Sequence, residues 1–350
     1  MGYTRRKLLA AAGAGTVGLS GCLSDEGSEG GDDNGEGAEF TAEVSFPVIH
    51  DFAENVVPEG AEANNLVPVG QHGHGWEPSP DVQRSVTTSD AFVYVFEGFQ
   101  PWADNMITNL RRDHPDVEVI AAGADVDLLG VGEGGHEHDE YAGEKSRDRA
   151  EGSGGHDGDS RGDHDGDGGG HDHGGNTNPH FWLDPLRAKT AVDSIADGLA
   201  AADQNEGYTE NADAYKSRLN DLHEEFESSL SGASKDTVLV AGHNAFTYLG
   251  ARYGFRVETL TGIAPDEQPD PQDIRRAQDL IDDEGIEYVL SPVFESDTAA
   301  ESLVEDTTAE EILPVTAFAS FSEDWLEEGW GYVEVMRNVN LSSLERALEA

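Results

Sequence analysis

The chain has 350 residues, and its 71 acidic and 21 basic side chains give a formal net charge of −50. This charge excludes nucleic acid as a partner, because phosphate binding depends on basic patches. Disordered chains are also acidic, but apolar segments such as AFVYVF (91–96) predict a folded core. We interpret the charge as that of a haloarchaeal-type protein working in molar salt, where the Debye length is about 3 Å. Metal capture then depends on direct ligand contact.

The N-terminus is typical of an export signal. The basic run RRK (5–7) precedes a short stretch of small and apolar residues, which predicts a signal peptide over 1–22. Its two arginines resemble a twin-arginine signal, and its last four residues, LSGC, resemble a lipobox. Cys22 is the only cysteine, so no disulfide is expected and Cys22 is the predicted lipidation site. Residues 23–40 then form a flexible tether at the external membrane face, and the lipid is the only membrane contact.

Strand and helix patterns alternate after the tether. Strands are predicted over 41–49, 66–70, 91–98 and 117–126, and helices over 52–57, 79–90 and 101–115. This alternation predicts βαβ units with a parallel sheet. We expect an N-terminal α/β lobe over 41–185, interrupted by a disordered insert rich in His, Asp and Gly over 132–177.

A long helical region follows over 186–231, with a break near Glu206 and Gly207. We expect it to act as a long rigid helix that connects two lobes. A second alternating block forms the C-terminal α/β lobe, 232–350. Its predicted strands are 237–243, 255–260, 286–292 and 312–318, and its predicted helices 244–254, 271–285, 297–307 and 331–350. The expected fold class is α/β, with a parallel-type sheet flanked by helices in each lobe and a ligand site in the interdomain cleft.

Three histidines outside the insert fall where this cleft is expected, namely His74, His180 and His243. Neutral imidazoles from separate segments suit tetrahedral Zn²⁺ and other borderline cations. A single histidine at a strand end is as readily a capping or core residue, but three at cleft positions favour a metal site. Three other histidines are given structural roles. We expect His50 to pack at a helix start, His114 to cap a helix end, and His223 to lie on the polar side of the connecting helix.

Five motifs together resemble one family. They are HGWEPSP (74–80), NPHFWLDP (178–185), GHNAFTYLGARYGF (242–255), TGIAPDEQPDPQDI (261–274) and GYVEVMRNVNLSSL (331–344). From Val44 to Leu348, outside the insert, the chain resembles the zinc/manganese substrate-binding proteins of ABC importers, the ZnuA-like or TroA-like cluster. The resemblance implies a monomeric extracytoplasmic receptor, not an enzyme, that captures Zn²⁺ in its cleft. It implies delivery of the ion to an ABC permease and its ATPase, with Mn²⁺ as the alternative cargo.

The resemblance assigns His74, His180 and His243 as metal ligands. Some family members carry Glu at the third position and prefer manganese, so His243 favours zinc. The fourth ligand in the family is often a carboxylate from the segment before the last helix. That segment offers Glu323 and Asp324 here, and a water molecule or His72 is the alternative.

The insert contains six histidines among Gly and acidic residues. Zinc-specific members of the resembling family often carry a His/acidic loop at this place. The predicted auxiliary metal-binding residues are His136, His138, His156, His164, His171 and His173. Histidine pairs on a glycine-rich chain can chelate cations weakly, whereas the alternative is an insert that only improves solubility.

Two other functions remain open from the sequence. One is a surface metal-buffering or adhesion lipoprotein without a transporter, which an absent neighbouring permease gene would favour. The other is a zinc hydrolase, because three histidines with an open position also make a catalytic site. The chain has no HExxH motif, and the carboxylate near His74 is Glu77, which precedes a proline.

Overall fold

The computed structural model describes residues 40–71, 73, 75–130, 177–264 and 267–350, and these all belong to one compact unit, Ala38–Ala350. The predicted signal peptide with Cys22, the predicted tether up to residue 39 and nearly all of the predicted insert lie outside the described residues, whereas Phe40 begins the first strand. None of the helices within the described ranges is long and apolar enough to cross a bilayer.

The first lobe contains a four-stranded parallel sheet in the order β2-β1-β3-β4. Its strands are β1 (Phe40–Val44), β2 (Ala61–Asn65), β3 (Ala91–Tyr94) and β4 (Glu118–Ala121). Its helices are α1 (Pro47–Val56), α2 (Pro80–Thr88) and α3 (Pro101–Asp113). Each helix begins with proline, which suits the first turn because its missing N–H has no partner there. Ser79 caps α2 by accepting the N–H of Val82.

Two predicted strands of this lobe are wrong in part. The strand predicted over 41–49 ends at Val44, because Pro47 begins α1. The strand predicted over 66–70 is instead the loop after β2. β2 has the polar sequence AEANN, and it pairs with β1 through its backbone at the edge of the sheet. An edge strand with half-exposed side chains carries little hydrophobic signal, so sequence pattern cannot find it.

The second lobe repeats this topology with the order β6-β5-β7-β8, again all parallel. Its strands are β5 (Thr237–Val240), β6 (Arg256–Thr259), β7 (Tyr288–Pro292) and β8 (Glu311–Val315). Its helices are α6 (Thr247–Tyr253), α7 (Pro271–Glu284) and α8 (Thr298–Asp306). The sequence therefore predicts the fold class correctly, with two parallel-sheet α/β lobes flanked by helices.

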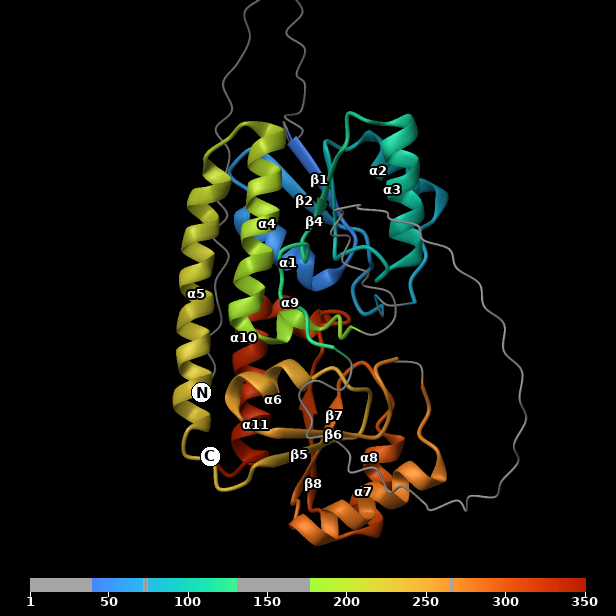
Figure 1. The fold of residues 1–350 in the computed structure, drawn as a ribbon, viewed down its shortest axis with the longest axis vertical. Coiled ribbons are helices and arrows are strands. Elements are labelled where there is room, and N and C mark those ends of the chain that lie inside the picture. Colours follow the sequence, from blue (N-terminus) through green and yellow to red (C-terminus); the bar gives the residue numbers. More distant parts are fainter. Residues whose placement is uncertain (1–39, 72, 74, 131–176, 265–266) are drawn as a thin grey trace, which may run out of the picture. The chain divides into compact units, whose positions relative to one another are not determined.

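The region predicted as one connecting helix contains two helices, α4 (Pro185–Asp203) and α5 (Gly207–Leu230), which lie side by side in Figure 1. They are antiparallel, since Lys189 bonds Asn220 while Asp193 pairs with Lys216. The chain reverses at the predicted break, where Gln204 adopts a left-handed φ of 56°. α5 contacts α1 of the first lobe and α6 of the second, so it contacts both lobes.

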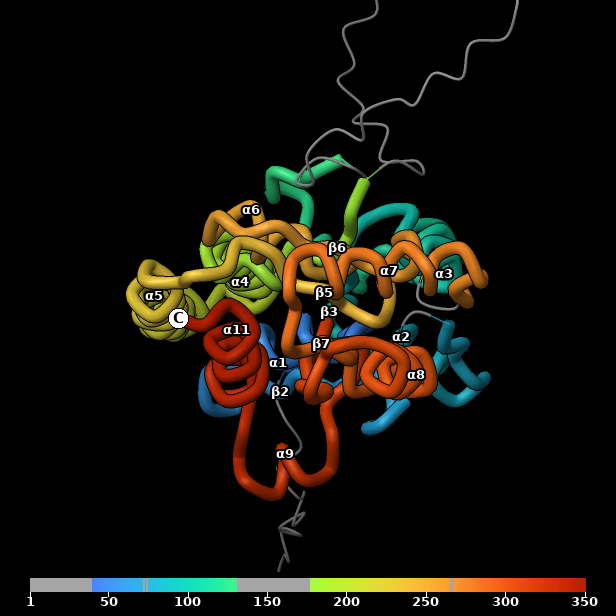
Figure 2. The backbone as a smooth tube through the Cα atoms, turned by 90° about the horizontal axis from the view of Figure 1, so that it is seen from below, coloured from blue at the N-terminus to red at the C-terminus, as the bar shows by residue number. Residues whose placement is uncertain are grey.

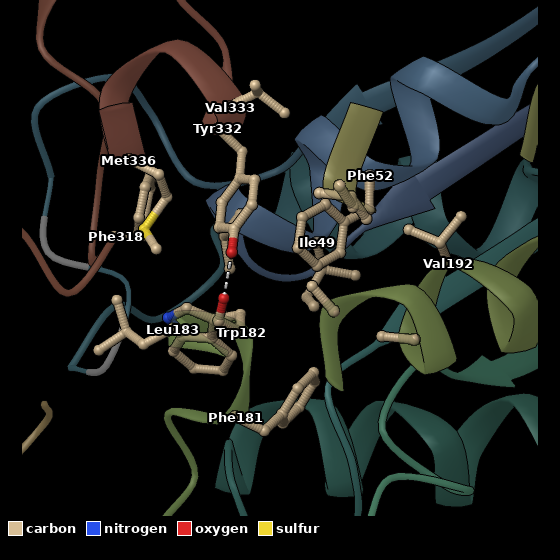
Figure 3. Packing of buried hydrophobic residues seen from close by; sticks show 14 of the residues in the cluster. Ile49, Phe52, Phe181, Trp182, Leu183, Val192, Phe318, Tyr332, Val333 and Met336 are labelled. Atoms are coloured by element: carbon tan, nitrogen blue, oxygen red, sulfur yellow. Dashed lines mark hydrogen bonds between the residues drawn. The ribbon is translucent and has the colours of Figure 1, made fainter. Parts of the chain in front are cut away.

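The chain then crosses from β8 through α9 (Glu323–Glu327) to a final helical run. This run comprises α10 (Tyr332–Val335), a π-helical segment (Met336–Leu341) and α11 (Ser342–Ala347). It agrees with the helix predicted over 331–350. Figure 3 shows Tyr332 in the buried cluster, where its hydroxyl donates to the carbonyl of Trp182 at 2.5 Å. Phe52 and Phe318 pack on the same Tyr332 ring. One apolar core therefore joins residues of both lobes.

Candidate metal centre

His180 is fully buried and follows the predicted insert, directly before the short 3₁₀ helix Phe181–Leu183. Its ring is oriented by Asn178, whose side-chain oxygen accepts the backbone N–H of His180 at 3.0 Å and its Nδ1 at 2.9 Å. An amide oxygen can only accept, so this contact places the proton on Nδ1. The lone pair of the neutral ring is then on Nε2.

His243 follows β5, is 1% exposed, and lies with its Nδ1 2.5 Å from Oε1 of Glu295. Glu295 follows β7, the strand next to β5. The strand order reverses between β5 and β7, which is the point where ligands of open α/β sheets bind. The carboxylate accepts from Nδ1, so the neutral form of His243 has its lone pair on Nε2.

Gly242 allows the close approach of these two strand ends. A Cβ atom at Gly242 would lie 2.6 Å from the Pro292 ring and 2.7 Å from the second carboxylate oxygen of Glu295. Real Cβ contacts of this kind essentially do not occur, so a larger residue must displace the Pro292 ring and the Glu295 carboxylate. Glycine at this position therefore leaves the space that the Glu295 carboxylate occupies beside His243.

The two rings meet with their Nε2 atoms 3.2 Å apart. An ion bound to both nitrogens at 2.0–2.1 Å in tetrahedral geometry would hold them about 3.3–3.4 Å apart. The observed separation is close to that value, and each ring has its Nδ1 against an oxygen, from Asn178 or from Glu295. The spacing of the pair is therefore compatible with two ligands of one tetrahedral cation.

Asp184 connects the segment of His180 to the second lobe. Its fully buried carboxylate accepts from Arg187 of α4 at 2.6 Å and from Nε and Nη2 of Arg252 of α6 at 2.9 and 2.6 Å. The hydrogen bond to Asp184 raises the pKa of Arg252, so this guanidinium stays charged. A buried charge with two cationic partners fixes α6 against the start of α4.

Tyr248 of α6 holds the two chain segments that flank the predicted insert. Its hydroxyl accepts the N–H of Leu129 at 2.8 Å and donates to the carbonyl of Asn178 at 2.8 Å. Gly130 and Thr177 form an antiparallel bridge just beyond these contacts. Burial raises the pKa of Tyr248 to about 12, so the hydroxyl remains a donor.

The remaining predicted ligands fall mostly outside the described residues. This holds for His72, His74 and all six insert histidines: His136, His138, His156, His164, His171 and His173. Gly73, between the first two, is described and donates its N–H to Ala319 at 2.9 Å. Among the residues that the structure describes, no three His, Cys, Asp or Glu side chains form a group able to hold a metal.

Glu323 and Asp324 are exposed on α9, which Figure 2 shows on a loop that projects away from the sheets. In the part of the chain that is described, the structure shows no hydrogen bond or ion pair from either residue to His180, His243 or Glu295. The segment that does reach the ligand-bearing loops is 317–321, AFASF, which carries no carboxylate. Its Ala317 carbonyl accepts from Trp182 at 2.9 Å, two residues after His180.

The other histidines have structural contacts. His114 is the C-cap of α3, as predicted, and the Nε2 of His50 lies 3.1 Å from the carbonyl of Ala63. The prediction for His223 is wrong, because its ring packs on Tyr253 with Nδ1 3.2 Å from the hydroxyl. Sequence reasoning missed Glu295 and Asn178, although Glu295 lies in the loop directly after the strand next to β5, where a polar side chain can reach the site.

Two parallel-sheet α/β lobes, with His180 before α4 and His243 after β5 placing their Nε2 atoms 3.2 Å apart, define a two-lobed α/β protein with a candidate metal site. Residues 43–347 match the family model of ZnuA, the periplasmic component A of the zinc-uptake complex. The chain belongs to this family.

Two relatives and one solved structure illustrate the similarity. The zinc-binding lipoprotein AdcA of Streptococcus pneumoniae (strain ATCC BAA-255 / R6) is 27% identical over 311 residues, which cover 87% of this chain and 55% of the relative. The chain thus spans about half the length of AdcA. The high-affinity zinc uptake system protein ZnuA of Bacillus subtilis (strain 168) is 23% identical over 324 residues, covering 91% and 90% of the two chains. The Zn(II)-bound ZnuA-like domain of S. pneumoniae AdcA superposes on this chain with a TM-score of 0.67 at 24% identity. The superposition covers 89% of this chain and 99% of that domain, so the two have the same fold.

Proposed function

We propose that this chain is the extracytoplasmic receptor of a zinc importer, which captures Zn²⁺ in its cleft and delivers it to an ABC permease driven by an ATPase. The observation that carries the proposal is the 3.2 Å separation of the two Nε2 atoms of His180 and His243. Membership of the zinc-uptake family supports the same reading. The protein has no catalytic role in this account, so zinc-loaded protein should hydrolyse model esters only at the background rate.

His74 is the proposed third ligand. Its neighbour Gly73 is tied to Ala319, two residues after the Ala317 carbonyl that holds Trp182. One short segment of the second lobe therefore supports the chain beside His74 and the chain beside His180. A water molecule or His72 completes the coordination, since Glu323 and Asp324 are exposed on α9.

Zinc is the proposed cargo in preference to manganese. Three imidazoles make a nitrogen-rich site, which suits zinc, whereas manganese prefers carboxylate and carbonyl oxygen. The insert histidines are proposed to bind further zinc weakly and to supply it to the tight site.

The proposed location is the external face of the cell membrane. The protein reaches it by twin-arginine export and is anchored there as a monomer through lipidated Cys22 and the 23–40 tether. We propose lobe boundaries of 41–185 and 232–350, joined by 186–231. The acidic surface is proposed to be an adaptation to molar salt in a haloarchaeal-type cell.

Zinc accumulation in cells tests this function. A strain lacking the gene is complemented with the wild type, His180→Ala, His243→Ala or a matched control, His114→Ala, at equal protein levels. The wild type and the control should restore uptake from zinc-depleted medium, and the two site variants should not. Uptake that is the same with and without the gene would favour metal buffering over import.

A further inference from the structure

We propose that Glu295 is the positioning residue that gives the zinc site its negative charge, acting through the ring of His243 rather than as a metal ligand. The inference rests on the proposed zinc site. Glu295 belongs to the second lobe and contacts the ring nitrogen of His243 that faces away from His180. It is a different residue from Glu323 and Asp324, the carboxylates expected as ligands before the last helix.

Glu295 is fixed on His243 from several directions. Oε1 lies 2.5 Å from Nδ1, and the backbone N–H of Glu295 donates to the carbonyl of Pro292 at 2.9 Å. The Glu295 side chain is 15% exposed and that of His243 is 1% exposed, so little water screens the pair. The carboxylate therefore holds one tautomer and one orientation of the His243 ring.

Segment 317–321 has no carboxylate that could take the place of the Glu295 carboxylate. That segment reaches both ligand-bearing loops of the first lobe and contains only Ala, Phe and Ser. Glu323 and Asp324 are exposed on α9. Of the described acidic side chains, Glu295 is the one in direct contact with a ring of the histidine pair.

The two histidines are supported differently. His180 has a neutral amide, Asn178, on its Nδ1, whereas His243 has a carboxylate. A carboxylate on the far nitrogen raises the basicity of an imidazole ligand, and loss of such a partner typically weakens metal binding. His243 is therefore the stronger donor of the pair, and a stronger nitrogen donor favours zinc over manganese.

The surroundings of Glu295 allow a clean substitution. Glu295 also lines a cavity of about 550 Å³, together with Thr261, Glu267 and Ser296. A glutamine at position 295 has nearly the same shape, keeps an oxygen that can accept from Nδ1, and can place its amide toward this polar cavity. Glu295→Gln therefore removes the charge while it preserves the contact.

The test compares zinc and manganese dissociation constants of the full chain for Glu295→Gln, Glu295→Ala and Glu295→Asp. Glu267→Gln is the matched control, because Glu267 lines the same cavity but bonds the N–H of Gly262. We expect zinc affinity to fall about tenfold for glutamine and about 100-fold for alanine, with partial recovery for aspartate and no change for the control. The ratio of zinc to manganese affinity should fall in the same order.

Ring-nitrogen NMR of the metal-free protein gives a readout that a general loss of stability would not change. His243 should keep its Nδ1–H tautomer in Glu295→Gln and sample both tautomers in Glu295→Ala. Wild-type zinc affinity in Glu295→Gln would overturn the proposal. His243→Ala separates this failure from failure of the site itself, because wild-type affinity in that variant would show that the tight site lies elsewhere.

Discussion

The Nε2 atom of His180 lies 3.2 Å from the Nε2 atom of His243, although 63 positions separate the two residues in the chain. Each ring is turned by an oxygen on its Nδ1, from Asn178 in one case and Glu295 in the other. The site is therefore pre-organised by side chains that are not themselves ligands. Such partners often matter nearly as much as the ligands, because they fix both ring orientation and tautomer.

Asn178→Ala should weaken zinc binding by about tenfold, because His180 loses the acceptor that fixes its ring. Competitive zinc titration measures the change. Asn109→Ala, at an exposed position on α3, is the control. Equal affinities of Asn178→Ala and the wild type would show that His180 is oriented by other contacts.

Gly242→Ala should lower zinc affinity although residue 242 is not a ligand. The added methyl group would lie within 2.7 Å of the Pro292 ring and the Glu295 carboxylate, so these side chains must move. We expect a loss of about 10- to 100-fold, similar to loss of the Glu295 partner itself. Gly232→Ala is the control, because a Cβ there meets no atom within 4 Å. Unchanged affinity in Gly242→Ala would contradict the close packing of these strand ends.

Tyr248→Phe should destabilise the protein by about 1–3 kcal/mol, because the Leu129 N–H and the Asn178 carbonyl both lose a partner. Denaturant unfolding in high salt measures the free energy of unfolding. Tyr288→Phe is a control on a tyrosine whose ring and hydroxyl both contact Arg346, so it loses a side-chain bond rather than two backbone bonds. A loss no larger than that of the control would mean that solvent replaces both bonds.

Asp184→Ala should cost about 3–5 kcal/mol, because Arg187 and Arg252 would lose a fully buried carboxylate. Asp81→Ala is the matched control, because Asp81 pairs with Arg84 on the exposed face of α2. Its free energy of unfolding should fall by less than about 1 kcal/mol. Thermal and denaturant unfolding provide the comparison. Similar losses for the two variants would argue against a structural role of the buried network.

Asp51 should make stability depend on pH between about 4 and 6. Burial raises the pKa of its carboxyl from 3.8 to about 6, partly opposed by hydrogen bonds from Tyr215 and Tyr332. The folded state then binds the proton more tightly than the unfolded state, so this contribution is fully present below pH 4 and is lost as pH rises through 6. The total is about 3 kcal/mol.

Asp51→Asn should remove this dependence. We expect the free energy of unfolding of Asp51→Asn, measured at pH 4, 5, 6 and 7, to rise relative to that of the wild type as pH increases, by up to about 3 kcal/mol. Any constant offset from altered hydrogen bonds does not change that slope. Parallel curves for the two proteins would mean that Asp51 titrates in the folded state as it does in the unfolded chain.

The sequence predicts the parallel α/β architecture because buried strands such as β3 and β7 are apolar and helices begin at prolines. It does not locate β2, whose edge pairing depends on the backbone rather than on side-chain pattern. It selects His180 and His243 by their motifs. It misses Glu295, because a glutamate after a strand resembles a solvated loop residue until the neighbouring strand is known.

Competitive zinc titration in high salt, for the wild type and for a chain lacking 132–176, tests the central claim most directly. The deletion joins segments that already meet at the bridge between Gly130 and Thr177, so the described lobes should be undisturbed. We expect one tight zinc per molecule in both proteins, with weaker sites lost on deletion. Loss of the tight site with the insert would contradict its assignment to His74, His180 and His243.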